Sequence, residues 1–303
     1  MPRRAAGSGV LVTAATLWAF GAAASAAAAE PAAQAAIHLV DDDQHSLVLP
    51  RPAQRLVSLS PGSTEMLFAA GAGERVVGTS EYSDTPLAAH AITRVGDSQS
   101  FDLERILALH PDVVVVWSGG TSQAQIARLE HVGLAIYHQR LTHLDDIPAS
   151  LARLGRLAGT EAQAQSAAAA LSQRIAALRR QFARAPAASV LIQVWDRPIY
   201  TVGREQLMTD VIHVCGYRNL YEDLIDPAPA VALESVLARD PDIILALAPD
   251  RQAERDWLAG WGAYPSLKAV RNGRVLGWTD RRLSGLGPSI VDAAEDLCRA
   301  LRR

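Results

Sequence analysis

The chain has 303 residues, of which 49% are hydrophobic and 20% are charged, as in an ordinary globular protein. The formal net charge is −3, so no strong basic field favours a nucleic-acid partner. The length is sufficient for two domains.

Residues 1–29 have the pattern of a secretory signal peptide. Arg3 and Arg4 precede an apolar run at residues 10–24, and the small residues 25–29 offer cleavage sites of the A-x-A type. The alternative is a membrane anchor, which needs about 20 continuously apolar residues. We therefore expect a mature protein that is soluble and exported.

Residues 37–143 are predicted to form a first α/β lobe. Residues 37–40 and 47–49 flank an Asp-rich turn at residues 41–45, which predicts a hairpin whose acidic turn lies in solvent. Beyond the hairpin, strands alternate with helices, and this order predicts a mainly parallel sheet. The predicted strands are residues 55–59, 76–79, 113–117 and 135–138.

Residues 144–186 are predicted to be connecting helices. The segment 144–158 is the first, and 161–184 is a long helix with one apolar stripe. The stripe consists of Leu171, Ile175, Leu178 and Phe182. A single long helix between two lobes acts as a stiff strut, so we expect little hinge closure.

Residues 187–303 are predicted to form a second α/β lobe. It starts with a strand at residues 189–195 and has a late strand at 274–278. The loop 279–287 then precedes a C-terminal helix at residues 288–301. The predicted fold is therefore α/β, with two Rossmann-like lobes joined by one long backbone helix.

A repeated motif supports two similar lobes. The pattern L-E-x-x-L-A-x-x-P-D occurs at residues 103–112 and again at 233–242, and each copy leads into an apolar run. Each copy predicts a short helix that ends at Pro-Asp and leads into a buried strand. Glu104 and Glu234 occupy equivalent positions in the two copies. Taken singly, each is also explained by the preference for acids in the first turn of a helix.

Aromatic residues gather at one kind of position in a chain that is only 5% aromatic. They lie at or just after predicted strand ends: Tyr82, Trp117, Trp195, Tyr200 and Trp278. Ligands of parallel α/β sheets bind beyond the carboxyl ends of the strands. Each residue alone is equally consistent with a core or rim position, but together they predict an aromatic-lined cleft for a large, partly apolar ligand.

Sequence motifs of catalysis are not found. The chain contains no G-x-S-x-G, no P-loop, no H-E-x-x-H and no G-x-G-x-x-G after a strand. The eight histidines are scattered, and only His138 and His143 are close in sequence. We expect neither catalysis nor a metal site.

Cys215 and Cys298 suit an oxidising compartment, and neither belongs to a C-x-x-C pair of the kind found in zinc sites. From the residues alone, a disulfide and two buried free thiols both remain open.

Residues 37–303 resemble the periplasmic substrate-binding proteins of ABC importers that have a rigid helical backbone, and among them the cobalamin-binding proteins. The residues that carry the resemblance are 55–61, 64–65, 77–78, 82–84, 86, 103–106, 117, 119–120, 201, 203, 214–216, 236–239 and 297–298. The segment 82–84, the W-x-G-G motif at 117–120 and the cysteine pair are closest to the cobalamin branch.

The resemblance implies a function for several residues. Tyr82 and Trp117 would line a corrinoid pocket in the first lobe, Tyr200 would take an aromatic position in the second lobe, and Asp280 would start a polar loop that contacts the ligand. The resemblance implies that Glu104 and Glu234 dock onto arginines of the membrane permease. It also implies a Cys215–Cys298 disulfide. The partners would be the permease and its ATPase, and the protein would be a monomer without a cofactor.

Two positions depart from the cobalamin-binding pattern, because Ser98 and Ala228 stand where tryptophan is usual. Trp195 is expected to replace part of that aromatic surface. Arg281 and Arg282 would suit anionic ligand groups. A ferric-siderophore or haem receptor of the same fold is therefore the main alternative, and a tetrapyrrole metal chelatase is the alternative among enzymes.

Overall fold

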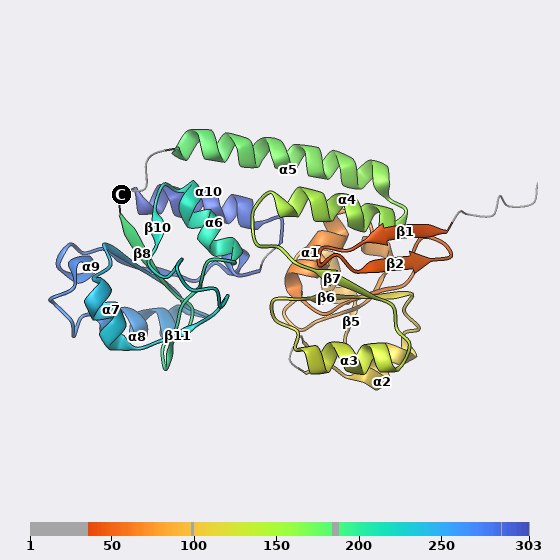
Figure 1. Ribbon diagram of the computed structural model, residues 1–303, viewed down its shortest axis with the longest axis horizontal. Helices are drawn as coiled ribbons and strands as arrows, with labels where there is room; N and C mark the ends of the chain where they lie inside the picture. Colours follow the sequence, from red (N-terminus) through yellow and green to blue (C-terminus); the bar gives the residue numbers. More distant parts are fainter. Residues whose placement is uncertain (1–35, 98–99, 184–187, 286, 303) are drawn as a thin grey trace, which may run out of the picture. The chain divides into compact units, whose positions relative to one another are not determined.

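Two parallel β-sheets organise the computed structural model, which describes residues 36–97, 100–183, 188–285 and 287–302. The first sheet has the strand order β5-β4-β3-β6-β7, and all neighbouring strands are parallel (Figure 1). Its strands are β3 (Leu56–Ser58), β4 (Val76–Thr79), β5 (Thr93–Arg94), β6 (Val113–Trp117) and β7 (Ile136–Gln139). The predicted signal peptide at residues 1–29 lies outside the described residues.

The second sheet repeats the arrangement of the first. Its order is β10-β8-β12-β13, again with parallel neighbours. Its strands are β8 (Ser189–Gln193), β10 (Arg218–Asn219), β12 (Ile243–Leu247) and β13 (Val275–Trp278). In both sheets the strand that comes first in the sequence, β3 or β8, is an inner strand. The strands that follow it directly in sequence add on one side, and the last two strands of the sheet add on the other side. Two small antiparallel pairs are β1 (Ile37–Val40) with β2 (Ser46–Leu49), and β9 (Ile199–Tyr200) with β11 (Ala230–Val231).

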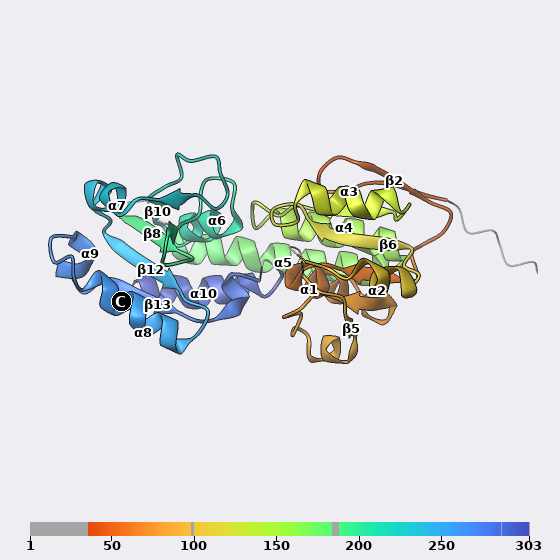
Figure 2. The same ribbon diagram turned by 90° about the horizontal axis from the view of Figure 1, so that it is seen from below.

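Helices connect and cover the strands. The α-helices besides the long α5 are α1 (Pro61–Ala69), α2 (Leu103–Ala108), α3 (Gln123–His131), α4 (Asp146–Ala158), α6 (Leu207–Val214), α7 (Leu233–Arg239), α8 (Arg251–Trp261), α9 (Lys268–Arg271) and α10 (Ile290–Leu301). The described residues also form the short 3-10 helices η1 (Gly73–Arg75), η2 (Leu87–Ala91) and η3 (Arg281–Leu283). Figure 2 shows α8 beside β13, which it contacts.

The predicted long helix is α5 (Glu161–Phe182), and its apolar stripe is buried as expected. It packs against α4 in the first half of the chain and against α6 and α10 in the second half (Figure 1). The described residues belong to one compact unit. The predicted α/β fold with two lobes is thus confirmed. The lobe boundaries at 37–143, 144–186 and 187–303 stay a prediction, and residues 186 and 187 lie outside the described part.

Strand β6 shows how each sheet buries both faces. Val113 and Val115 pack into the core beneath α1 and α4, whereas Val114 and Val116 pack beneath α2 and α3. Successive side chains of a strand point to opposite faces, so a continuous apolar run is what a two-sided core requires.

The two copies of the repeated motif have the same structure. Each forms a short helix followed by a strand beside the central strand: α2 with β6, and α7 with β12. The Asp112 carboxylate accepts hydrogen bonds from the backbone N–H groups of Gln54 and Arg55, at 2.7 and 2.9 Å. The Asp242 carboxylate accepts from the N–H and the hydroxyl of Ser189, at 2.8 and 3.0 Å. The Asp of each Pro-Asp pair therefore ties the turn to the start of the central strand.

The expectation that the acidic turn lies in solvent is wrong. The Asp41 side chain is fully buried, and that of Asp42 is 3% exposed. Asp42 accepts hydrogen bonds from Tyr137 and Ser150 at 2.7 Å each and pairs with Arg153 at 2.8 Å. The turn is therefore folded onto β7 and α4, because distant polar groups satisfy its carboxylates.

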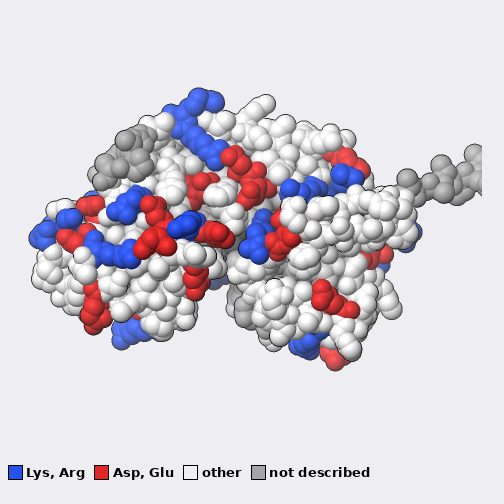
Figure 3. All heavy atoms as spheres, in the orientation of Figure 1, with Lys and Arg blue, Asp and Glu red and all other residues white. Residues whose placement is uncertain are grey.

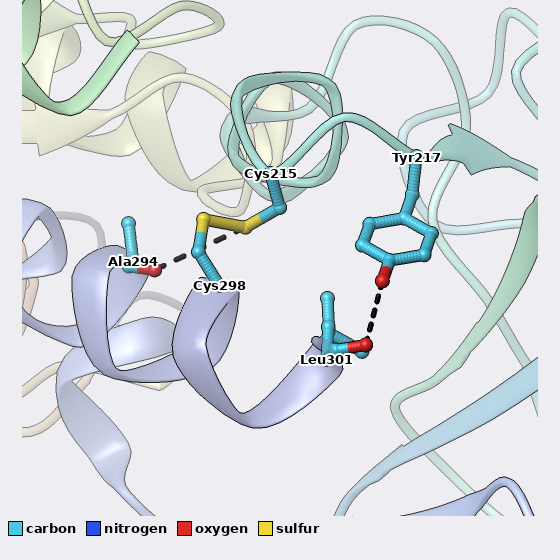
Figure 4. Close-up of a disulfide and its surroundings, with 5 residues drawn as sticks. All are labelled: Cys215, Tyr217, Ala294, Cys298 and Leu301. Atoms are coloured by element: carbon cyan, nitrogen blue, oxygen red, sulfur yellow. Dashed lines mark hydrogen bonds between the residues drawn. A yellow bond between two sulfur atoms is a disulfide. The ribbon is translucent and has the colours of Figure 1, made fainter. Parts of the chain in front are cut away.

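The Cys215–Cys298 disulfide implied by the resemblance is present, with the Cα atoms 4.8 Å apart. Figure 4 shows the bridge between the end of α6 and α10, with the Tyr217 hydroxyl bonded to the Leu301 carbonyl nearby at 2.6 Å. Both contacts hold α10 against the end of α6 and the residues that follow it.

Charged side chains of both signs are mixed on one face of the protein. On the face drawn in Figure 3, Lys and Arg alternate with Asp and Glu, without a large area of one sign. Within the described part of the chain, no helix combines the length and the apolar character needed to cross a bilayer.

Candidate ligand-binding site

A cavity of about 580 Å³ lies at the carboxyl ends of strands from both sheets. Its lining comes from the segments after β4, β8, β12 and β13 and from the start of α1. The residues are Pro61, Glu65, Tyr82, Asp84, Thr85, Val194, Trp195, Leu247, Ala248, Pro249, Trp278, Thr279, Asp280, Arg281, Arg282, Leu283, Ser284, Gly285 and Ser289. This is the edge at which parallel α/β sheets bind ligands.

Tyr82 forms part of the first-lobe wall. Its backbone is in the left-handed region, with φ of 61°, and its side chain is exposed. The guanidinium of Arg281 lies 5.5 Å from the Tyr82 ring centroid, within range of a cation–π contact. No acidic residue in the described part pairs with Arg281. The cavity therefore carries an aromatic face with an accessible cation beside it.

Two tryptophans form the second-lobe wall. Trp195 is 53% exposed and contacts the buried Trp257 edge to face, with ring centroids 6.4 Å apart. The indole N–H of Trp278 is buried and has no hydrogen-bond partner among the described residues. An exposed ring held by a buried one offers apolar area to a ligand at a low cost in side-chain entropy.

Asp280 and Arg282 form an ion pair rather than two free charges. The Arg282 Nε lies 2.9 Å from Asp280 Oδ2, and the guanidinium also reaches Asp296 at 3.1 Å. Hydrogen bonding to Arg282 is the main cause that lowers the pKa of the Asp280 carboxyl, and the same bond raises the pKa of Arg282. The charge of Arg282 is thus balanced by Asp280 and Asp296. Of the two arginines that line the cavity, Arg281 is the one available to pair with a ligand.

Glu65 connects the two lobes at the cavity wall. Its carboxylate accepts hydrogen bonds from the backbone N–H and the hydroxyl of Ser289, at 2.6 and 2.9 Å. Burial raises the pKa of the Glu65 carboxyl, although the bonds from Ser289 and the charge of Arg282 act in the opposite direction.

Trp117 lines two smaller cavities, of about 60 and 70 Å³. The first of these also has Pro61, Ser284 and Gly285 in its wall, which line the large cavity as well. The W-x-G-G motif has a steric reason, because a Cβ atom on Gly119 or Gly120 would collide with the Trp117 ring. The glycines therefore let the indole lie against its own loop.

Gln139 is one of the residues that line the 60 Å³ cavity. The residue is 2% exposed, and its Oε1 accepts from the Ser63 hydroxyl at 2.5 Å. Ser63 in turn bonds the Ser60 hydroxyl at 2.7 Å. The Gln139 Nε2 is buried and has no partner among the described residues. A buried donor without a partner is costly, so this amide is a polar group that the fold itself leaves unsatisfied.

The structure brings most of the predicted ligand residues together. Those that line the large cavity are Tyr82, Trp195, Asp280, Arg281 and Arg282. Trp117 lies in the adjoining small cavities, and Tyr200 does not line the large cavity but pairs with Trp195 through a β-bridge. Of the two departures, Ala228 is exposed and Ser98 lies outside the described residues. Glu65 lines the large cavity and Gln139 lines the 60 Å³ cavity, but neither was predicted from the sequence as a site residue.

Glu104 and Glu234 lie in the first turns of α2 and α7, and both are exposed. Neither carboxylate has a hydrogen-bond or ion-pair partner in the described part of the chain. Each helix runs antiparallel to the strand that follows it, so both helices start at the carboxyl edge of a sheet, where the ligand loops also lie.

Aromatic rings, a buried amide and an accessible guanidinium are groups that can hold a small molecule. The fold and the cavity thus define a receptor for a small molecule. The chain belongs to the periplasmic binding protein family, whose profile it matches over residues 56–281.

Relatives and solved structures agree with this membership. The vitamin B12-binding protein of Vibrio cholerae serotype O1 is 33% identical over 256 residues, which cover 84% of this chain and 92% of that protein. The crystal structure of the periplasmic vitamin B12-binding protein of Vibrio cholerae matches with a TM-score of 0.75 at 32% identity, over 83% of this chain and 97% of that one. The periplasmic heme-binding protein of Roseiflexus sp. RS-1 matches with a TM-score of 0.69 at 26% identity, over 82% and 98% of the two chains.

Proposed function

We propose that this protein captures cobalamin or a related corrinoid in the large cavity and delivers it to an ABC importer. The observation that carries the proposal is the cavity at the carboxyl ends of both sheets, with Tyr82 on one side and Trp195 on the other. The identity of 33% to a vitamin B12-binding protein supports the corrinoid as the ligand.

The geometry suits a large ring with polar substituents. The exposed rings of Tyr82 and Trp195 would contact the corrin macrocycle, since a flat aromatic side chain loses little freedom on binding. Arg281 would pair with the phosphate that links the corrin to its nucleotide, because a guanidinium matches phosphate oxygens. Gln139 would donate to an amide carbonyl of the corrin periphery.

The transport role follows from the same fold. Because α5 is one stiff helix packed on both halves, ligand capture would involve little lobe movement. The holoprotein would then be recognised at the membrane through Glu104 and Glu234. We assign the protein to the periplasm as a monomer, with the permease and its ATPase as partners and no catalysis of its own.

A ligand titration tests the proposal. The purified protein is titrated with cyanocobalamin, cobinamide, haem and a ferric hydroxamate, following tryptophan fluorescence. Saturable quenching by cyanocobalamin or cobinamide is expected, because Trp195 and Trp278 line the cavity. The variant Ile225→Ala is a matched control, since Ile225 is exposed and does not line the cavity. No response to either corrinoid would sink the proposal.

Haem is the second candidate ligand, and one observation favours it. Tyr82 contributes the phenol in the lining of the large cavity, and Arg281 lies beside it. Phenolate ligates haem iron in some proteins, and arginine pairs with carboxylates such as the propionates. The variant Tyr82→Phe separates the candidates. Loss of the phenol would change the absorption spectrum of bound haem, whereas corrinoid affinity would change little because the aromatic ring is kept.

A further inference from the structure

Two histidines meet one buried carboxylate at the end of β7. The Nδ1 atom of His138 lies 2.8 Å from Asp41 Oδ2, and the Nδ1 atom of His45 lies 3.6 Å from the same oxygen. The two imidazole centroids are 4.3 Å apart, and one ligand-type atom from each of the three residues lies within 4.8 Å of the others. The histidines are scattered in sequence, but the fold brings these two together.

The Asp41 carboxylate is held by the backbone independently of both rings. Its Oδ1 accepts hydrogen bonds from the N–H groups of Asp43 and His45, at 3.0 and 2.8 Å. Its Oδ2 accepts from the N–H of His138 at 2.9 Å. Outer hydrogen bonds of this kind orient a carboxylate for metal binding. The oxygen would therefore stay in place while the imidazoles reorient.

The charge at this turn is incompletely balanced. Asp42 pairs with Arg153 at 2.8 Å, and Asp43 pairs with Arg140. Asp41 is fully buried, yet no Lys or Arg in the described part of the chain pairs with it. A buried anion is costly unless a cation compensates it, and here the groups that face it are the two imidazoles.

The cluster is open to solvent on one side. The side chain of His45 is 60% exposed, whereas that of His138 is 11% exposed. An ion from solvent can thus reach the buried carboxylate past His45. A water molecule would complete the coordination on the open side.

We propose that Asp41, His45 and His138 bind one divalent transition-metal ion, with Zn²⁺ as the best match. Two imidazole nitrogens and one carboxylate oxygen suit zinc and its neighbours in the first row rather than calcium or magnesium. Binding would displace the proton that His138 Nδ1 shares with Asp41, either to Nε2 of the same ring or to solvent, because the ligating nitrogen must be deprotonated. The freed Nδ1 lone pair would then bind the metal in place of the hydrogen bond to Asp41. The ion would fasten the β1–β2 hairpin to β7. None of the three residues lines the large cavity, so the site does not depend on the corrinoid proposal.

A metal competition assay tests the site. The purified protein, without a histidine tag and after EDTA treatment, is titrated with Zn²⁺ in the presence of a chromophoric chelator. We expect one equivalent to bind. The variant His45→Ala should bind at least about tenfold more weakly, a loss seen even for residues that only support a metal ligand. His143→Ala is the matched control. The side chain of His143 is 62% exposed, close to the 60% of His45, and its Nδ1 atom lies 3.8 Å from the Asp210 carboxylate.

Thermal unfolding gives a second readout on the same variants. An ion that binds the folded state raises the Tm. Zn²⁺ should therefore raise the Tm of the unmodified protein and of His143→Ala, and should leave that of His45→Ala almost unchanged. The proposal is overturned if the unmodified protein binds no zinc saturably, or if His45→Ala binds zinc as tightly and gains the same Tm.

Discussion

The carboxylate of Glu65 accepts two hydrogen bonds from Ser289, one from the backbone N–H at 2.6 Å and one from the hydroxyl at 2.9 Å. Glu65 lies in α1 of the first lobe, and Ser289 lies immediately before α10 of the second. The contact therefore fixes the distance between the lobes at the wall of the large cavity. It complements α5, which joins the lobes on another side of the fold.

Stability should depend on pH through Glu65. Burial raises the pKa of this carboxyl above its ordinary value of 4.5. The folded state therefore holds the proton more tightly than the unfolded state. The resulting stabilisation is present below pH 4.5 and is lost as the pH rises through the pKa of the folded protein.

The variant Glu65→Gln removes this dependence. Urea unfolding of both proteins at about pH 4 and about pH 7 should show that the unmodified protein loses stability relative to Glu65→Gln at the higher pH. The exposed Glu130→Gln is a control, for which the difference should be almost flat. A difference for Glu65→Gln that is flat or has the opposite sign would contradict the assignment.

The aromatic walls should account for much of the ligand affinity. Tyr82→Ala and Trp195→Ala each remove an exposed ring from the cavity, and truncation of such a contact costs about 1–2 kcal/mol, or about tenfold in Kd. Fluorescence or calorimetric titration with cyanocobalamin measures the change. Affinity as tight as that of Ile225→Ala would show that the ligand binds elsewhere.

Gln139 should act through its buried amide N–H groups. In Gln139→Glu the volume and the hydrogen bond from Ser63 are kept, but the donor becomes an oxygen. We expect corrinoid affinity to fall by about tenfold or more, since the ligand acceptor then faces a group that cannot donate. A Tm close to that of the unmodified protein would show that the fold is intact. Unchanged affinity in a folded variant would remove Gln139 from the site.

Local patterns in the sequence indicate the strands, whereas contacts between residues far apart in sequence leave no such pattern. The strands β6 and β12 were predictable because a run of apolar residues follows the same Pro-Asp turn twice. Helix α8 was not predicted, since only Trp257 and Trp261 are buried in a segment that is otherwise polar. The repeat therefore revealed the sheets but not all the helices that cover them.

The wrong expectation for the Asp-rich turn and the failure to predict Gln139 have the same origin, because both depend on contacts between residues far apart in sequence. An Asp in a turn between two strands looks exposed, because its partners Tyr137, Ser150 and Arg153 lie about a hundred residues away. Gln139 at the end of a strand gives no local sign of the cavity that it faces. The aromatic residues had a local signal, since five of them lie at or just after strand ends, and Tyr82, Trp195 and Trp278 line the large cavity.

Docking to the importer should require both glutamates of the repeat. Glu104→Gln with Glu234→Gln removes two exposed charges, each of which would form a charge-assisted bond of about 1.5–3 kcal/mol. Formation of the complex with the importer in lipid nanodiscs should weaken by at least about tenfold, while corrinoid affinity stays unchanged.

The control for docking removes the same charge from other surfaces. Glu130 lies in the last turn of α3, at the opposite edge of the first sheet, and Glu161 lies in the first turn of α5. The double variant Glu130→Gln with Glu161→Gln should bind the importer normally. Equal weakening by both double variants would mean that net charge, rather than the two repeat positions, governs docking.

The disulfide should be a major source of stability for the second lobe. It closes a loop across 83 residues of sequence separation, and the chain-entropy account assigns about 4 kcal/mol to a loop of this size. The double variant Cys215→Ser with Cys298→Ser should therefore unfold at a clearly lower guanidinium concentration. Addition of a reductant should destabilise the unmodified protein and leave the double variant unaffected.

Because the bridge lies between α6 and α10, away from the residues that line the large cavity, the folded variant should retain its corrinoid affinity. Loss of affinity at a temperature where the variant is fully folded would show instead that the bridge shapes the cavity through α10 and Ser289.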